Sequence, residues 1–233
     1  MPAPALSKCV LLPGLDGSGI FFAELTEALH GKAETLVLTY PEHGPQSYTA
    51  LADHLRRQMP DEDYVIVAES FAGPLAILLA AQAPVKPKSL ILAASFARNP
   101  FPLFGGMFGN ALPGLINDKA LPVMEAVLLR PGDHEMTWKV FQTVSRLDPN
   151  VLRDRIKAVT TCDVTKPLAQ LDLPILYLQG TEDKLVSAAH GALVARTGKH
   201  VTLARVATPH FVLQYDVDAT VRDHILPFLE ACA

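Results

Sequence analysis

Cysteine is scarce in this chain of 233 residues, and the few that occur are widely separated. Cys9, Cys162 and Cys232 are odd in number and far apart, so a disulfide framework is not expected. Their scarcity favours a reducing compartment, and we expect a cytoplasmic location. The N-terminus also lacks a basic flank followed by an apolar core, which is the pattern of a secretory signal.

Long apolar runs and strong net charge are missing as well. The longest apolar run, around residues 75–85, is too short to span a bilayer and contains Gln82, so stable membrane insertion is not expected. The formal net charge is −4, which gives no general attraction to nucleic acid. Hydrophobic residues make up 49% of the chain and charged residues 19%, which suits a large buried core.

Motifs for metals and nucleotides are absent too. The histidines show no pairing at metal-ligand spacing, and the Gly-Lys-Ser/Thr sequence of a phosphate-binding P-loop does not occur. The glycine-rich turn at residues 14–19 reads G-x-x-G-x-G, the reverse of the dinucleotide fingerprint. Tyr40 and Pro41 stand where that fingerprint needs an acid. We therefore expect neither a metal nor a bound cofactor.

What the chain does contain is a serine between a strand pattern and a helix pattern. Residues 64–67 are apolar and β-branched, as in a buried parallel strand, and a helix-like run follows Gly73. The turn between them reads A-x-S-x-A, from Ala68 through Ser70 to Ala72, where G-x-S-x-G is commoner. A serine in such a nucleophile elbow has a strained backbone, costing roughly 1–3 kcal/mol. The alternative is a serine in an ordinary strand-to-helix loop.

Strand and helix patterns alternate along most of the chain. Strands are predicted at residues 8–12, 35–39, 64–67, 89–93, 174–179 and 201–206. Helices are predicted at residues 20–29, 48–59, 74–83, 187–196 and 217–229, with Pro227 distorting the last turn. Alternation of this kind predicts an α/β fold with a mostly parallel sheet and helices on both faces. Residues 96–168 contain helical patterns but no convincing strand, so we interpret them as a helical lid inserted into a core of residues 1–95 and 169–233.

Three polar residues lie just past the ends of predicted strands. Reactive groups in parallel sheets gather at the carboxyl ends of the strands, where Ser70, Asp183 and His210 are expected to lie. A serine hydroxyl needs a base within reach, and the base needs a group that fixes its tautomer. The order Ser, Asp, His is that of α/β-hydrolases. Glu182 is the alternative acid, and both Asp183 and His210 also suit ordinary surface turns.

A carbonyl under attack becomes negatively charged at its oxygen, and two backbone N–H groups usually hold that oxygen. Phe71, directly after the serine, is expected to supply one of them. Leu15 or Asp16 in the glycine-rich loop is expected to supply the other, with Leu15 preferred. Asp16 is in addition a candidate substrate contact.

The chain resembles the α/β-hydrolase superfamily over nearly its whole length. The motifs that carry the resemblance are LLPGLDGSG (11–19), VAESFAGP (67–74), LQGTEDKLV (178–186) and ATPHFVLQ (207–214). The resemblance implies a six-stranded sheet of order 2-1-3-4-5-6, without the N-terminal strand pair of many relatives. Size, lid position and the residues after the histidine are similar to small carboxylesterases, including those that cleave pimeloyl-carrier-protein methyl ester in biotin synthesis. Those enzymes usually have His-Gly and Gly-x-Ser-x-Gly-Gly where this chain has LPGLDGSG and AESFAGP.

Together these features predict a serine esterase that uses an acyl-enzyme intermediate and no cofactor. Its expected partner is a small-molecule ester, and an acyl carrier protein is a candidate second partner because the resemblance includes enzymes acting on carrier-bound methyl esters. The enzymatic alternatives are an acyl thioesterase and an acyltransferase. The alternative outside enzymes is a ligand-binding receptor on the same fold.

Two features of the predicted lid bear on the substrate. The apolar segment at residues 99–109 is predicted to cover the cleft, with Phe104 and Phe108 lining an acyl pocket. Arg155 falls on the apolar stripe of its helix and is a candidate contact for an acidic carrier protein or a substrate carboxylate. The simpler interpretation is a solvated helix face on which Arg155 extends its charge to water.

Overall fold

The computed structural model describes residues 6–101 and 118–232, and at its centre lies a six-stranded sheet. The sheet order is β2-β1-β3-β4-β5-β6 and every neighbouring pair is parallel, as predicted. The strands are β1 (Leu6–Leu12), β2 (Ala33–Val37), β3 (Tyr64–Glu69), β4 (Ser89–Ala93), β5 (Pro174–Gly180) and β6 (His200–Val206). In such a sheet all carboxyl ends meet at one edge, which is where the predicted site residues were expected.

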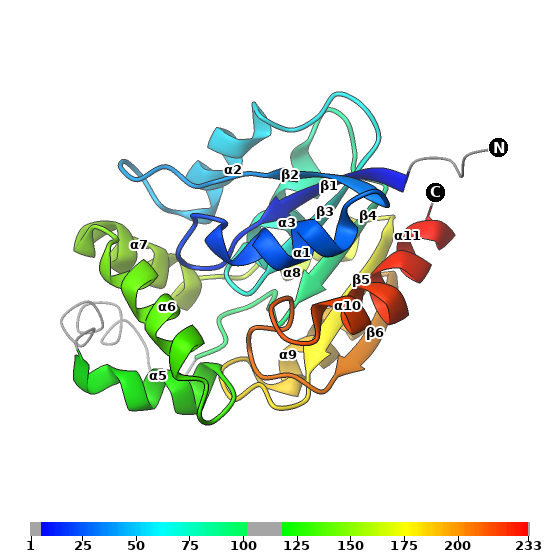
Figure 1. Ribbon diagram of the computed structural model, residues 1–233. Helices are drawn as coiled ribbons and strands as arrows, with labels where there is room; N and C mark the ends of the chain where they lie inside the picture. Colours follow the sequence, from blue (N-terminus) through cyan, green and yellow to red (C-terminus); the bar gives the residue numbers. More distant parts are fainter. Residues whose placement is uncertain (1–5, 102–117, 233) are drawn as a thin grey trace.

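Helices cover both faces of the sheet (Figure 1). One face carries α1 (Ala23–Leu29), α10 (Val217–Thr220) and α11 (Leu226–Ala231). The other face carries α2 (Tyr48–Arg56), α3 (Ala72–Gln82), α8 (Thr165–Gln170) and α9 (Ala188–Thr197). A 3-10 turn precedes α1, and a π-helical turn at Val221–Ile225 separates α10 from α11. The π-helical turn ends just before Pro227, which has no N–H for a regular helical hydrogen bond.

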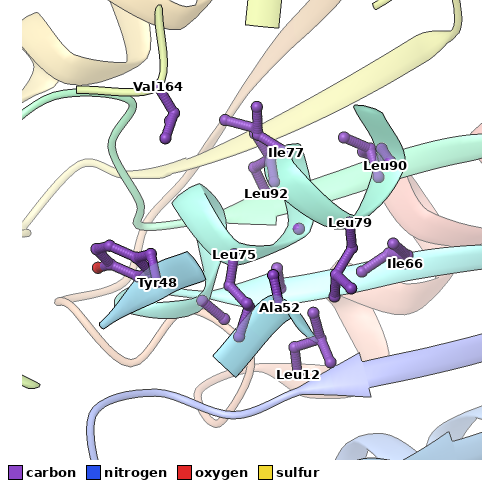
Figure 2. Close-up of a cluster of buried hydrophobic side chains, with 14 of the residues drawn as sticks. Leu12, Tyr48, Ala52, Ile66, Leu75, Ile77, Leu79, Leu90, Leu92 and Val164 are labelled. Atoms are coloured by element: carbon purple, nitrogen blue, oxygen red, sulfur yellow. The ribbon is translucent and has the colours of Figure 1, made fainter. Parts of the chain in front are cut away.

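The strands are buried on both sides, which explains their nearly continuous apolar sequence. In β3, Tyr64, Ile66 and Ala68 pack toward α2 and α3, whereas Val65 and Val67 pack toward α1 and the C-terminal helices. Figure 2 shows the first of these clusters, where side chains of α3 meet those of β1, β3 and β4. Each fully buried aliphatic side chain contributes roughly 1.5–3 kcal/mol. The two apolar layers hold the strand ends in fixed positions.

A helical insertion follows β4, as predicted. It contains a 3-10 turn (Asp118–Ala120), α5 (Leu121–Leu128), α6 (His134–Ser145) and α7 (Pro149–Thr160). The chain leaves and re-enters the core side by side, because Val164 N donates to Ala97 O at 2.8 Å and Asn99 N donates to Cys162 O at 2.9 Å. Figure 1 shows the insertion on the side of the sheet opposite the two chain ends.

Several elements differ from the sequence prediction; the helix expected at residues 48–59, for example, ends at Arg56. The strand expected at residues 35–39 spans Ala33–Val37, because β2 follows the register of β1, where Leu11 pairs with Val37. The short helix α8 was not predicted; it packs between α3 and α9. Among the described helices, none is long and apolar enough to cross a bilayer.

Candidate active site

Ser70 lies in a tight turn between β3 and α3, with the left-handed backbone angle φ of 51°. Ser70 N donates to Ala93 O at 2.9 Å, and the hydroxyl of Ser95 donates to Ser70 O at 2.6 Å. A left-handed non-glycine residue costs about 1–3 kcal/mol, so these bonds hold a conformation that the serine alone would avoid. Residue 73 has to be glycine, because a Cβ there would lie 1.8 Å from the Ser95 hydroxyl oxygen.

His210 follows β6, and its imidazole lies between the serine and an aspartate. Ser70 Oγ is 2.7 Å from His210 Nε2, and His210 Nδ1 is 2.9 Å from Asp183 Oδ2. An ionised carboxylate only accepts hydrogen bonds, so Nδ1–H donates to Asp183 and Nε2 accepts from the serine hydroxyl. The structure therefore brings the three predicted side chains together in one hydrogen-bonded chain.

Asp183 is held firmly at the end of β5. Its side chain has 0% exposure. Its Oδ1 accepts hydrogen bonds from Leu185 N at 2.8 Å and Val186 N at 2.9 Å. Glu182, the alternative acid, is exposed. Asp183, and not Glu182, is therefore the acid that the imidazole of His210 contacts in this structure.

Two backbone N–H groups near Ser70 are free to hold an oxyanion. Leu15 and Phe71, whose N–H groups the sequence analysis named as candidate oxyanion donors, both line the cavity beside Ser70. Neither N–H donates a hydrogen bond to another described residue. Phe71 also stacks on Tyr48 with ring centroids 4.8 Å apart, which fixes the start of α3.

A cavity of about 890 Å³ lies beside Ser70, between the edge of the sheet and the insertion. Both Ser70 and His210 line it. Most of its other lining is apolar, including Phe22, Phe101, Met124, Val140, Leu152 and Phe211. Among its described lining residues, the acids and bases other than His210 are Asp16, Glu69 and Lys119. This lining suits an uncharged, apolar group placed next to the serine.

The remaining predicted substrate contacts are Asp16, Phe104, Phe108 and Arg155, and among the described ones the structure places only Asp16 at the cavity. Asp16 lines the cavity, but its Oδ2 accepts hydrogen bonds from Ser18 N at 2.8 Å and Ser18 Oγ at 2.5 Å. Phe104 and Phe108 lie outside the described residues. Arg155 neither lines the cavity nor extends to solvent, because its side chain is buried against the glycine-rich loop. A substrate or carrier-protein contact for Arg155 was therefore the wrong interpretation, and so was a solvated charge.

Glu69, a buried carboxyl directly before Ser70, was not predicted as a site residue. It accepts hydrogen bonds from Gln214 Nε2 at 3.0 Å and Leu213 N at 3.3 Å. Burial raises the pKa of Glu69 from 4.5 to about 7, while the nearby His210 favours its charged form. The signal that could have indicated it is an acid at the end of an otherwise apolar strand. Ser95 was missed as well, because nothing in its local sequence marks it as a support of the turn.

No group of three metal-ligating side chains occurs among the residues that the structure describes.

A model of the alpha/beta hydrolase family matches residues 9–229. The chain therefore belongs to the alpha/beta hydrolase family.

Particular relatives add detail to this assignment. The chain is 25% identical over 209 residues to the pimeloyl-[acyl-carrier protein] methyl ester esterase of Neisseria meningitidis serogroup B, covering 82% of this chain and 81% of that protein. Its structure is similar to that of MenH from S. aureus, with a TM-score of 0.83 and 16% identity, over 99% of this chain and 96% of that one. The esterase RhEst1 from Rhodococcus sp. ECU1013 has a TM-score of 0.79 and 19% identity, over 97% and 91% of the two chains. The two structural matches establish a shared fold alone.

Proposed function

We propose that this protein is a serine hydrolase that cleaves carboxylic esters, with Ser70, His210 and Asp183 as catalytic residues. The observation that carries the proposal is the unbroken hydrogen-bond chain through these side chains, with distances of 2.7 and 2.9 Å. The serine stands in a strained turn beside an apolar cavity, within reach of a bound ester. Membership of the alpha/beta hydrolase family supports the same reaction class.

The arrangement allows acyl transfer in two halves. Ser70 Oγ attacks the ester carbonyl carbon while His210 Nε2 accepts the hydroxyl proton, and Asp183 stabilises the resulting imidazolium. The tetrahedral intermediate then collapses, the bond to the alcohol oxygen breaks, and His210 returns the proton to the leaving alcohol. A water molecule attacks the acyl-enzyme by the same route, which releases the carboxylic acid and restores the serine.

The N–H groups of Leu15 and Phe71 are the proposed donors to the developing oxyanion. Both line the cavity beside Ser70, and neither is engaged by another described residue. Donors that are already oriented need no rearrangement as charge develops, and removing one such donor costs about 10²–10³ in kcat.

The proposed substrates are esters with an uncharged, apolar acyl chain. The apolar lining of the 890 Å³ cavity supports this class, because it offers few partners for a charged acyl group. The relatives from Neisseria meningitidis are named for a carrier-protein-bound methyl ester. Pimeloyl-carrier-protein methyl ester is therefore the first natural substrate to test.

A fluorophosphonate probe tests the catalytic assignment directly, because it phosphonylates activated serines. Wild type is expected to be labelled and to hydrolyse p-nitrophenyl esters, whereas Ser70→Ala should lose both properties. Ser187→Ala, a change at an exposed serine before α9, is the matched control and should behave as wild type. Equal labelling of wild type and Ser70→Ala would overturn the assignment.

Substrate class is tested with paired oxygen esters and thioesters of the same acyl chain, including the carrier-bound methyl ester. The proposal expects a higher kcat/KM for the oxygen ester in each pair. A consistent preference for thioesters would instead identify an acyl thioesterase with the same catalytic residues.

A further inference from the structure

Arg155 is a buried cation in helix α7 that the proposed reaction does not use. Its side chain is 1% exposed, and among the described residues no carboxylate lies within ion-pair distance of it. Burial lowers the pKa of its guanidinium group. Burying a charge without an ion-pair partner is unfavourable unless its hydrogen-bond donors are satisfied. The identity of its acceptors therefore indicates what this residue does.

The acceptors are neutral oxygens, and two of them belong to the glycine-rich loop. Nη1 of Arg155 donates to Leu15 O at 2.9 Å and to Asp16 O at 2.8 Å. Nε donates to the side-chain oxygen of Gln46 at 2.9 Å, and Nη2 donates to Pro41 O at 3.3 Å. The guanidinium thus ties the helical insertion to the loop that carries a proposed oxyanion donor.

Each of the five carbonyl oxygens of the loop at residues 13–17 accepts a hydrogen bond. Besides the two held by Arg155, Tyr40 donates its hydroxyl to Pro13 O at 2.6 Å and its N–H to Gly17 O at 2.9 Å. Gly14 O accepts from Gly17 N at 3.1 Å. The loop therefore directs its carbonyl oxygens toward protein donors, while the N–H of Leu15 stays unengaged by the described residues.

Two linked peptide planes connect the guanidinium to that N–H. In a planar trans peptide the C=O and the following N–H point in opposite directions. Arg155 holds the carbonyl of Asp16, and the other end of this peptide is Gly17 N–H, which donates to Gly14 O. The opposite end of the Gly14 peptide is the N–H of Leu15. Fixing the first carbonyl therefore fixes the direction of the Leu15 N–H.

Gly17 gives independent evidence that this contact is a close fit. Its φ of +70° is left-handed, and a Cβ there would lie 2.7 Å from Arg155 Nη1 and 2.6 Å from Tyr40 Cδ2. The guanidinium also stacks on the Tyr40 ring, with its central carbon 5.3 Å from the ring centroid. The loop backbone has no room for a side chain at the point where the guanidinium approaches.

We propose that Arg155 is a positioning residue of the active site, which orients the Leu15 N–H toward the developing oxyanion without touching substrate. The inference rests on the proposed ester hydrolysis. It assigns to the insertion a part in the chemical step in addition to covering the cavity. Loss of the guanidinium should therefore weaken binding of the transition state more than binding of the substrate.

The test compares Arg155→Met with wild type on a p-nitrophenyl ester and with an alkyl trifluoromethyl ketone, which forms a tetrahedral adduct with an active serine. For Arg155→Met we expect kcat to fall by about 10²-fold, the range seen for loss of one oxyanion donor, with KM changed less than threefold. Affinity for the trifluoromethyl ketone should fall in parallel with kcat/KM. Arg153→Met should leave all three quantities unchanged, because Arg153 lies on the same helix but, within the described part of the chain, bonds only to Asn150 and Asp154.

A variant that keeps kcat and ketone affinity within threefold of wild type would overturn the inference. A fall in kcat without a parallel fall in ketone affinity would overturn it as well. If Arg155→Met does not fold, as judged by thermal unfolding, the same criteria apply to Arg155→Gln, which keeps a polar but shorter side chain. Fluorophosphonate labelling of wild type at Ser70 tests the proposed hydrolase function separately, so failure of that function is recognised before the variants are compared.

Discussion

Helices α7 and α5 line the same cavity, but they are held in opposite ways. Helix α7 contains six buried residues, including Arg155, whose side chain donates to the loop at residues 13–17. Helix α5 contains no buried residue among its eight, and Val123 on it is 63% exposed while still lining the cavity. The insertion is therefore not uniform: one of its helices belongs with the catalytic groups, and the other is a loosely packed cover.

Helix α5 is attached by partly buried Met124 and Leu128, which pack against the small apolar cluster of Phe21, Leu129 and Val140, and by polar contacts. Lys184 Nζ donates to Ala126 O at 2.9 Å, and the Glu125 carboxylate accepts from Gly132 N at 2.8 Å. A hydrogen bond contributes only about 0.5–1.5 kcal/mol net. We call α7, the loop at residues 13–17 and the strand ends carrying Ser70, Asp183 and His210 the frame, and α5 the cover. Side chains of the cover should therefore change without disturbing the frame.

The largest effect is expected at Asp183 in the frame. Asp183→Asn would present an amide to His210 Nδ1 and favour the wrong imidazole tautomer, so kcat should fall by about 10⁴-fold. Steady-state hydrolysis of a p-nitrophenyl ester measures this. The control is Glu182→Gln at the exposed neighbour, for which kcat should stay within twofold. A loss of less than tenfold in Asp183→Asn would mean that the frame does not orient the base as described.

Glu69 is expected to make the free energy of unfolding decrease as the pH rises. Its pKa is raised by burial from 4.5 to about 7, so the folded protein binds this proton more tightly than the unfolded chain does. The stability that Glu69 contributes is complete below pH 4.5 and is lost as the pH rises through 7, about 3 kcal/mol in all. Urea unfolding of wild type and Glu69→Gln at pH 5 and pH 8 should show a smaller pH-dependent loss in the variant. The same loss in both proteins would contradict the assignment.

A matched pair of substitutions separates the frame from the cover. Leu152→Ala in α7 removes a buried side chain at the wall of the cavity, and the free energy of unfolding should fall by about 2–3 kcal/mol. Val123→Ala in α5 should change it by less than about 0.5 kcal/mol. Val123→Ala should instead shift the preferred acyl length in a series of p-nitrophenyl esters. Equal destabilisation by the two changes would remove the distinction between frame and cover.

The sequence predicted most of the fold because its parallel strands are buried on both faces and read as short apolar runs. The strand β4 was predicted with its observed bounds, Ser89–Ala93. The edge strand β2 was displaced by two residues, because its bounds depend on pairing with β1 and not on its own pattern. Helix α8 has only six residues and includes Pro167, too short a segment to show a helical period.

The same reasoning explains which site residues could be predicted. Ser70 directly follows β3, and Asp183 and His210 lie a short way past the ends of β5 and β6, so local sequence and topology together indicated where they lie. The partners of Arg155 are mainly backbone oxygens more than a hundred residues away, and a sequence pattern carries no signal for such acceptors. Its position on an apolar stripe was interpreted as a ligand contact or a solvated charge, and the residue types around it did not reveal the loop that it contacts.

The absence of a side chain at Gly73 bears on which sequence motif identifies a serine in a turn of this kind. Alanine is accommodated two residues before and two residues after Ser70, whereas at Gly73 the space is filled by the Ser95 hydroxyl that bonds the backbone of the turn. In this turn the residue that must lack a side chain is thus Gly73, which packs against Ser95 in the loop after β4. The two positions that a G-x-S-x-G search examines, Ala68 and Ala72, both carry a methyl group. A motif that allows alanine at both flanks would include this serine, and glycine at the third residue after the serine would restore the specificity lost at the flanks.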